Sequence, residues 1–410
     1  MIKIYFKTVK NQSGAMTVTL LKHLLRKQGI ELLDTPQGAD AVFVSITDIT
    51  YFQVLHQAYK EFHGKIPIIA GGDISKLEFV RFYADYVVLG EAYNFIEQLA
   101  KVKRIEEIAE FKNVRTRSKD GEVDYQIKFM ENPIIKASNK VHYYYGGKGC
   151  LQRCKFCFYS HVNEYSMVDE GKILKALKTI PKGGKLYVTS AYFPYPKMPD
   201  EYLKKLGMID LKIGMYNKRN YPSRSFRVGV EFFYESTRKA MGKPVLDRQI
   251  VELINNSLDR KHELTTYFMG GVEDDDAIMN FVDLVPEYHR TYSPRIMLHT
   301  QYIDFNEMTP LADVSVRARK DFNRLLLKNE LDKKNRRFRV AEIKYKAHST
   351  WRTLIQRCKT FDEAEFLYKL KNVKDDNALM DKVESIFPHL IGKETMQYAL
   401  DLKPKRRKNE

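Results

Sequence analysis

Two blocks of alternating β and α patterns set the strongest limit on the fold of this chain of 410 residues. In the first block, helical patterns such as Met16–Gln28 separate four short apolar runs, at Ile2–Phe6, Ala41–Ile46, Ile66–Ala70 and Tyr86–Leu89. Continuous apolar runs of this length are typical of parallel strands that are buried on both faces. Residues 1–104 are therefore expected to form a doubly wound, Rossmann-like domain that binds ligands at the carboxyl ends of its strands.

The second block repeats the alternation after a polar, irregular linker at 105–140. We predict six strands, at His142–Tyr145, Lys185–Thr189, Ile209–Met215, Phe226–Phe233, Leu264–Met269 and Arg295–Ile303. Helical patterns lie between them, so residues 141–319 are expected to form an incomplete (β/α)6 barrel. Residues 320–410 are rich in charged, helical patterns. The predicted fold class is therefore α/β, with a helical, basic C-terminal region.

The positive charge of the chain is unevenly distributed. The formal net charge is +17, yet residues 1–100 hold ten basic and ten acidic side chains. A polyanionic partner is therefore expected to dock on the later part of the chain. No apolar run approaches the length of a membrane span, and the first residues read as a strand and not as a signal peptide. We expect a soluble, cytoplasmic protein with no membrane partner.

Three of the four cysteines, Cys150, Cys154 and Cys157, fall within eight residues, on the loop after the first strand of the predicted barrel. Three thiolates at this spacing can hold three irons of a cubane [4Fe-4S] cluster and leave the fourth iron open. The alternative is a zinc site whose fourth ligand is His142 or His161. A zinc-stabilised nucleic-acid-binding protein would then be the function. The loop position, at the end of a barrel where catalytic groups gather, favours the cluster.

The segment Cys150–Cys157, with Phe156 before its last cysteine, resembles the hallmark loop of the radical S-adenosylmethionine (SAM) superfamily. Phe226–Lys243, Thr265–Asp276 and Gln301–Leu311 resemble three barrel segments of the branch of that superfamily that carries cobalamin-binding domains. The resemblance implies an enzyme that reduces a [4Fe-4S] cluster, supplied with electrons by a flavodoxin or ferredoxin. It would cleave S-adenosylmethionine to a 5′-deoxyadenosyl radical.

The same resemblance implies roles for individual residues. The three cysteines would bind iron, and Glu231 would face the ribose or the substrate as a catalytic group. Arg238 would pair with the methionine carboxylate, unless Glu231 and Arg238 form an ordinary ion pair of the barrel. Further residues expected at the cofactor are Phe156, Thr189, Ser190, Gly270 and Gly271. Thr189 and Ser190 occupy the place of a glycine-rich element that this chain lacks.

Residues 1–104 resemble the cobalamin-binding domain of the same branch. Ser45, Gly71 and Gly72 would hold the nucleotide tail of a corrinoid. The segment Val9–Gly14 lacks the histidine with which many such domains coordinate cobalt. The domain is therefore expected either to bind cobalamin without a histidine ligand or to be a scaffold that has lost the corrinoid.

The shortage of cysteines excludes relatives that need a second cluster, because residues 1–149 contain none and only Cys358 follows the loop. Cys358 lies in a helical pattern and is expected to be a buried, small apolar residue. The alternative is a hydrogen donor to a substrate radical.

Aromatic residues and positive charge suggest the substrate. Tyr143–Tyr145 and Tyr192–Pro196 lie at predicted strand ends near the open mouth of the barrel. Aromatic platforms with a basic surface are typical of nucleic-acid recognition, although such residues also line barrel cores. The leading hypothesis is methylation or rearrangement of a base in DNA or RNA, and a small molecule or peptide is the alternative substrate.

Overall fold

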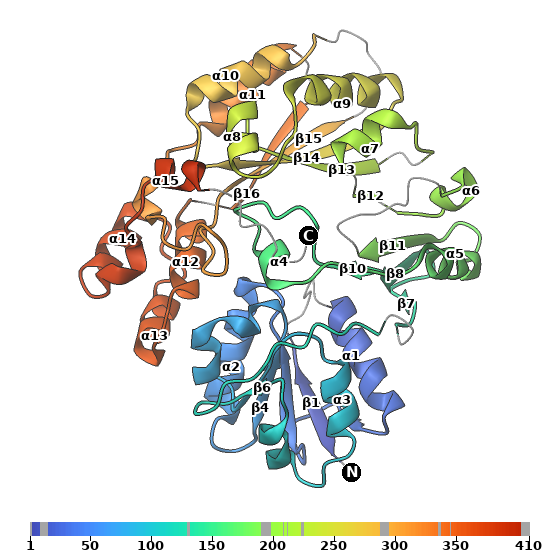
Figure 1. The fold of residues 1–410 in the computed structure, drawn as a ribbon, viewed down its shortest axis with the longest axis vertical. Coiled ribbons are helices and arrows are strands. Elements are labelled where there is room, and N and C mark those ends of the chain that lie inside the picture. Colours follow the sequence, from blue (N-terminus) through green and yellow to red (C-terminus); the bar gives the residue numbers. More distant parts are fainter. Residues whose placement is uncertain are drawn as a thin grey trace.

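The computed structural model describes residues 2–8, 15–128, 132–189, 198–207, 209–210, 212–222, 225–287, 295–334, 338–344 and 346–402. Figure 1 shows an N-terminal α/β domain, a second α/β domain above it, and C-terminal helices that run along one side of both. Ser190, Tyr192–Pro196 and the basic residues at 403–408 lie outside the described residues, as does all of Val9–Gly14. None of the described helices is long and apolar enough to cross a membrane.

The N-terminal domain is a doubly wound sheet, as predicted. Its strands are β1 (Lys3–Lys7), β2 (Glu31–Leu33), β3 (Ala41–Ser45), β4 (Ile68–Gly71), β5 (Tyr86–Val88) and β6 (Val114–Arg115). They follow the order β2-β1-β3-β4-β5-β6, and all pairs are parallel except β5 with β6. Helices α1 (Ala15–Lys27) and α3 (Tyr93–Leu99) cover one face and α2 (Phe52–Phe62) the other (Figure 1). Because helices cover both faces, every residue of β3 is buried.

The second domain is an open, mostly parallel β/α arrangement with two main sheets and one short antiparallel pair, β9 (Gly147–Lys148) with β10 (Ser166–Met167). One sheet pairs β11 (Lys185–Thr189), β8 (Val141–Tyr145) and β7 (Ile135–Lys136), and the other runs in the order β12-β13-β14-β15-β16. Its strands are β12 (Ile209–Asp210), β13 (Ser225–Glu231), β14 (Glu263–Gly270), β15 (Ile296–Tyr302) and β16 (Phe338–Lys344). The outer helices are α5 (Glu170–Thr179), α6 (Asp200–Leu203), α7 (Ile213–Lys218), α8 (Glu235–Ala240), α9 (Asp247–Asp259), α10 (Asp275–Leu284) and α11 (Arg324–Lys334).

Two predicted elements of this domain need correction. The strand expected over Ile209–Met215 ends at Asp210, and α7 begins at Ile213. A further parallel strand, β16, pairs with β15 although its sequence lies in the region expected to be helical. The residues expected as a linker are also used in sheets, because β6 pairs with β5 and β7 pairs with β8.

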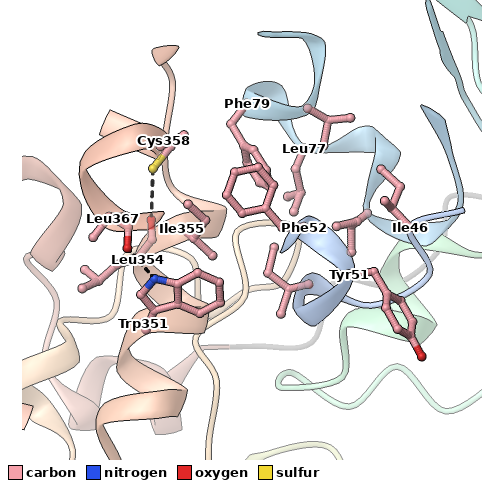
Figure 2. Packing of buried hydrophobic residues seen from close by; sticks show 14 of the residues in the cluster. Ile46, Tyr51, Phe52, Leu77, Phe79, Trp351, Leu354, Ile355, Cys358 and Leu367 are labelled. Carbon is pink, nitrogen blue, oxygen red and sulfur yellow. Dashed lines mark hydrogen bonds between the residues drawn. The ribbon is translucent and has the colours of Figure 1, made fainter. Parts of the chain in front are cut away.

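The C-terminal helices pack against the N-terminal domain. They are α12 (Lys346–Gln356), α13 (Phe361–Lys369), α14 (Asp376–Glu384) and α15 (Met396–Asp401). Figure 2 shows Trp351 and Ile355 of α12 in one buried cluster with Phe52 and Phe79. Cys358 is fully buried in this cluster, and its thiol donates to the Leu354 carbonyl at 3.7 Å. It packs as the small apolar residue that was expected.

An ion-pair network joins three parts of the chain at this contact. The Arg352 guanidinium lies 2.8 Å from Asp48 of the N-terminal domain and 2.8 Å from Asp304 after β15. Burial acts to raise the pKa of Asp48, but Arg352 outweighs it and holds that pKa well below its usual range. The network therefore fixes the N-terminal domain, the barrel end and α12 relative to one another.

Candidate active site

The second half of the cysteine loop is held by hydrogen bonds. After β8 the chain forms β9 (Gly147–Lys148), and Cys157 directly precedes α4 (Phe158–Val162). The Cys157 amide donates to the Cys154 carbonyl at 3.0 Å, which closes a tight turn. The Cys154 thiol donates to the Gly242 carbonyl at 3.4 Å, so the loop rests on the segment that follows α8. The three thiols are thus held on one fixed loop.

Cys150 and Cys157 line a cavity of about 930 Å³ that opens toward the inner faces of β13 and β14, and Cys154 is buried beside it. Burial raises the pKa of Cys154 to about 12, and the nearby Lys243 ammonium partly offsets this effect. Cys150 and Cys157 also act on the Cys154 ionisation, so the three thiols lie within electrostatic range of one another. Three thiols at the mouth of a large cavity are the donor set that a cubane cluster needs, since iron displaces the thiol protons on binding.

Of the two histidines proposed for a zinc site, His161 contacts the loop backbone and His142 lies toward the other end of β8. His161 Nε2 lies 3.0 Å from the Cys154 carbonyl oxygen, and its Nδ1 lies 3.5 Å from the Arg153 guanidinium. His142 is buried near the start of β8, whereas the cysteine loop follows the end of that strand. Within the described ranges, no group of three His, Cys, Asp or Glu side chains converges as ligands of a single ion. A cubane cluster needs no such convergence, because each thiolate binds a different iron.

Glu231 occupies a strained position on the cavity wall. It has a φ of 81°, a left-handed value that a non-glycine residue rarely adopts, and β13 is irregular between Gly229 and Glu231. Its carboxylate lies 3.1 Å from the Lys243 ammonium, and both residues line the cavity. A Cβ on Gly229 would meet the Glu231 carboxylate at 2.2 Å, so the glycine makes room for the pair. Burial acts to lower the pKa of Lys243, but Glu231 outweighs it and raises that pKa.

Lys243 is the cavity residue that the sequence reasoning missed. It was part of the segment used for the family resemblance, but its partner is set by how the loop after α8 returns to β13. The signal available in the sequence was the lysine directly after Gly242, in a segment that was already expected at the site. The structure shows that Gly242 has a positive φ.

Arg238 does not have the predicted position. Its guanidinium is fully buried and donates to the carbonyls of Phe232, Phe233 and Val245 at 2.7–2.8 Å, and it is ion-paired with Asp247. It is not among the residues that line the cavity. The expectation that it pairs with a methionine carboxylate is corrected, because its donors already hold the backbone after β13. Glu231 and Arg238 also do not pair with each other.

Gly270 and Gly271 also serve protein packing. A Cβ on Gly270 would meet the Phe322 ring at 2.7 Å, and Gly271 has a φ of +97° beside Tyr302. Neither lines the cavity among the described residues. The close approach predicted for these glycines exists, but the groups that approach are side chains of the same protein.

The other predicted cofactor residues lie around the loop. The Phe156 ring packs edge-on against Phe232, with 5.4 Å between ring centroids, and supports the loop from the core side. Thr189 ends β11, and its hydroxyl donates to the Tyr144 carbonyl at 3.4 Å. Phe156 and Thr189 therefore support the cysteine loop and the end of its neighbouring strand.

The N-terminal domain has a second cavity, of about 160 Å³, at the carboxyl ends of β3, β4 and β5. Ser45, Gly71 and Gly72 all line it, so the structure brings together the three residues predicted to hold a corrinoid tail. Mostly apolar side chains of α1 and α3 form part of the remaining wall. None of the described lining residues is a histidine.

The cysteine loop closes this second cavity from above. The Lys148 ammonium lies 2.6 Å from Glu91 and 3.2 Å from Asp73, and all three residues line the cavity. Burial acts to lower the pKa of Lys148, but the two carboxylates outweigh it and raise that pKa. Tyr159, two residues after Cys157, lines both cavities. The two candidate cofactor sites therefore meet at one side chain.

A buried lysine supports the loop from the other side. Lys155 lies between two of the cysteines and donates to the carbonyls of Ala399 and Leu400 at 3.0 and 2.9 Å. These carbonyls lie near the C-terminal end of α15, where a cation is electrostatically favoured. The last described helix thus anchors the cysteine loop.

No protein-family model and no curated protein matches this chain. Its fold does match solved structures. One is the radical S-adenosylmethionine methyltransferase TsrM from Kitasatospora setae, solved with tryptophan substrate and an S-adenosylmethionine analog. It is 13% identical over 72% of each chain, with a TM-score of 0.52.

A second match is the cobalamin-dependent S-adenosylmethionine radical enzyme OxsB, solved with aqua-cobalamin. It is 16% identical, with a TM-score of 0.51, over 75% of this chain and 54% of OxsB. This chain has the fold of these two enzymes. The predicted fold class is confirmed, and the chain spans about half the length of OxsB.

Proposed function

We propose that this protein is a radical SAM enzyme that binds a [4Fe-4S] cluster through Cys150, Cys154 and Cys157. The observation that carries the proposal is the cysteine loop at the mouth of the 930 Å³ cavity, within a fold shared with radical SAM enzymes. Once bound and reduced, the cluster would supply the electron that cleaves S-adenosylmethionine to a 5′-deoxyadenosyl radical. The protein supplies binding, orientation and a shielded cavity for that chemistry.

The Glu231–Lys243 pair is the proposed polar anchor of this cavity. Lys243 lies within electrostatic range of Cys154 and Cys157, so its ammonium stabilises their thiolates. Glu231 holds that ammonium and presents a carboxylate to the same space as Cys150 and Cys157. The carboxylate is thus placed to accept hydrogen bonds from hydroxyl or amino groups of a bound nucleoside.

Anaerobic reconstitution tests this proposal, with iron and sulfide measured per chain and 5′-deoxyadenosine assayed after reduction. Wild-type protein is expected to bind a full cluster and to produce 5′-deoxyadenosine, with flavodoxin or ferredoxin as the proposed electron donor. A Cys154→Ala variant is expected to lose both properties. A variant that keeps both would overturn the assignment, and zinc uptake without iron by the wild type would favour the non-enzymatic alternative.

We also propose that the N-terminal cavity holds the tail of a corrinoid. Support comes from the convergence of Ser45, Gly71 and Gly72 on this cavity and from the fold shared with cobalamin-dependent OxsB. Tyr159 would then lie between the corrinoid and the cavity of the cysteine loop. Reconstitution with hydroxocobalamin, followed by desalting and absorbance measurement, tests the proposal. Protein that retains no corrinoid would favour the scaffold alternative.

The proposed substrate is a base within DNA or RNA. The support is the lining of the large cavity, which combines several cationic side chains with Tyr159, Tyr221 and Tyr267. A small molecule is the second candidate, and the tryptophan bound to TsrM is the observation that favours it. Binding of single-stranded DNA and RNA oligomers across salt concentrations separates the two candidates. Loss of all polymer binding near physiological salt would leave the small molecule.

A further inference from the structure

A lysine-rich surface of the second domain lies outside both cavities. The stretch 171–199 contains six lysines and no aspartate or glutamate. Five of these lysines belong to the described residues, and each of the five is exposed: Lys172, Lys175, Lys178, Lys182 and Lys185. None of the five lines either cavity, so the candidate active site does not use them.

Three of these lysines form a row on α5. The helix buries Ile173, Ala176 and Leu177, so lysines spaced by three residues remain on its outer side. The row begins beside the cysteine loop, because the amide of residue 168 donates to the carbonyl of residue 146, where the loop leaves β8, at 2.9 Å. A helix of this length spans about 15 Å. The row therefore leads from the loop down the outside of the domain.

Further lysines gather at the far end of this row. The Lys185 amide donates to the Lys140 carbonyl at 2.8 Å, and the Leu186 amide donates to the Lys205 carbonyl at 2.8 Å. The Lys185 ammonium also donates to the Lys204 carbonyl. Lys140 and Lys204 are exposed, as Lys185 is. These lysines thus lie side by side at the amino-terminal ends of β8 and β11.

The charge of this surface is not neutralised from within the chain. None of the exposed lysines named above forms an ion pair with a carboxylate of the described residues. Asp169 accepts the Gly171 amide at 2.8 Å at the start of α5, and Asp200 pairs with Arg219. Unneutralised like charges repel one another, and a docked polyanion relieves this repulsion.

The side chains of this surface indicate the kind of polyanion. The large hydrophobic residues that are exposed among the described residues all lie on other elements. Protein interfaces gather aromatic residues, Met and Arg at their centre and are depleted in Lys. Hydrated lysines without an apolar centre suit phosphate groups, which they bind through charge and without reading a sequence.

The position of this surface separates a substrate from an electron donor. An electron donor has to approach the cysteine loop, whereas the lysines around Lys140 and Lys185 lie at the opposite ends of β8 and β11. A polynucleotide can reach both places, because it is an extended chain. Figure 1 shows α5 and α6 on the side of the second domain away from α12, α13 and α14, where no other element covers them.

We propose that these exposed lysines bind the sugar-phosphate backbone of a single-stranded polynucleotide. The inference rests on the proposed function, because it supplies an anchor for the DNA or RNA whose base enters the large cavity. Only an unstacked base can enter such a cavity, which favours a single strand. We call this set the lysine surface, and it consists of Lys140, Lys172, Lys175, Lys178, Lys182, Lys185 and Lys204.

The test uses full-length, reconstituted protein with fluorescent oligothymidylate and oligouridylate at several salt concentrations. The α5 variant combines Lys175→Gln, Lys178→Gln and Lys182→Gln. It is expected to bind at least one of the two oligomers about tenfold more weakly than the wild type. The slope of log affinity against log salt concentration is expected to fall by about two, because each phosphate contact of a single strand contributes about 0.7.

A matched control removes the same charge from another part of the protein. It combines Lys369→Gln, Lys374→Gln and Lys382→Gln, three exposed lysines of α13, α14 and the turn between them. Its net charge equals that of the α5 variant, and it is expected to bind both oligomers as the wild type does. A general effect of net charge would weaken binding equally in the two variants.

The outcomes separate the lysine surface from the proposed function. Weaker oligomer binding in the α5 variant alone supports the surface. Unchanged binding in the α5 variant, or an equal loss in the control, overturns it. Vesicles of phosphatidylserine and phosphatidylcholine are tested as well, and a loss confined to vesicle binding assigns the surface to a membrane instead. Iron per chain is measured on the same samples. Protein that holds iron but fails the binding test loses only the lysine surface, whereas wild-type protein without iron loses the proposed function.

Discussion

The two cavities that meet at Tyr159 are lined by different types of residue. The N-terminal cavity is small, about 160 Å³, and is lined by strand ends, by apolar side chains of two helices and by the paired charges of Lys148, Glu91 and Asp73. The barrel cavity is larger, about 930 Å³, and presents thiols, cations and one carboxylate. The first wall suits a ligand held by shape and backbone, and the second suits charged groups that react. The excess charge of the chain accordingly lies outside residues 1–100.

The cysteines provide the sharpest test of this difference. Cys157→Ala is expected to abolish cluster binding, because a cubane cluster cannot assemble stably on the two thiolates that remain. Cys358→Ala also removes one thiol, but from the buried hydrophobic residues around Trp351. This variant is expected to keep full iron content. Its cost is about 0.5–1.5 kcal/mol of unfolding free energy, since one buried heavy atom is lost. Iron analysis and denaturant unfolding measure both, and equal iron loss in the two variants would contradict the assignment.

Lys148 joins the segment before the cysteine loop to the wall of the N-terminal cavity. Lys148→Met leaves the Glu91 carboxylate buried without its ammonium partner, which is expected to cost about 3–5 kcal/mol of unfolding free energy. Lys148→Met combined with Glu91→Gln is expected to recover much of that loss, because the buried charge disappears with its partner. Urea unfolding of both proteins measures the difference. A double variant as unstable as the single variant would show that the ion pair is not the cause.

Glycine substitutions distinguish the two walls. Gly229→Ala places a Cβ 2.2 Å from the Glu231 carboxylate and is expected to cost about 1–3 kcal/mol and to displace the Glu231–Lys243 pair. Gly71→Ala places its Cβ 3.5 Å from Val88, an ordinary contact, and is expected to change stability little. Thermal unfolding of both variants measures the comparison. A larger loss of stability for Gly71→Ala than for Gly229→Ala would contradict our description of how tightly each cavity wall is packed.

A pH dependence that arises in the barrel is also expected. Burial, together with Arg260, lowers the pKa of His262 to about 4, so the folded state binds its proton less readily than the unfolded chain does. Above about pH 6.5 this site makes its full contribution to the unfolding free energy, and that contribution decreases as the pH falls toward 4. His262→Gln is expected to flatten this part of the pH profile, as measured by urea unfolding at several pH values. Parallel profiles for the two proteins would contradict the prediction.

Local patterns were sufficient to predict most of the longer strands. The apolar runs at Ala41–Ser45 and Ile68–Gly71 became buried parallel strands, because burial on both faces leaves an unbroken apolar signal. The cysteine loop also lies after the first strand of the barrel, as predicted, although the burial of β8 alternates along the strand. The strand at 338–344 was missed because its alternation is interrupted by charged residues.

Side-chain partners were harder to predict. Arg238 was expected at the methionine carboxylate, yet its donors are used by carbonyls on either side of α8. Lys243 lies at the cavity because the chain turns back toward β13 after α8, and sequence patterns do not predict that turn. Both outcomes depend on how two loops approach each other in space, whereas periodicity reports only on each element alone.

The hydrogen bonds of Lys155 have a consequence for how the protein is made. This lysine lies within the cysteine loop, and its partners are the carbonyls of residues 399 and 400, nearly 250 positions later. The loop therefore lacks its support until those residues have left the ribosome. Until then the thiols lack this one support, and they acquire their final environment only when the last described helix docks. A cluster bound by the proposed ligands would therefore reach its final environment only after α15 has been synthesised and has docked.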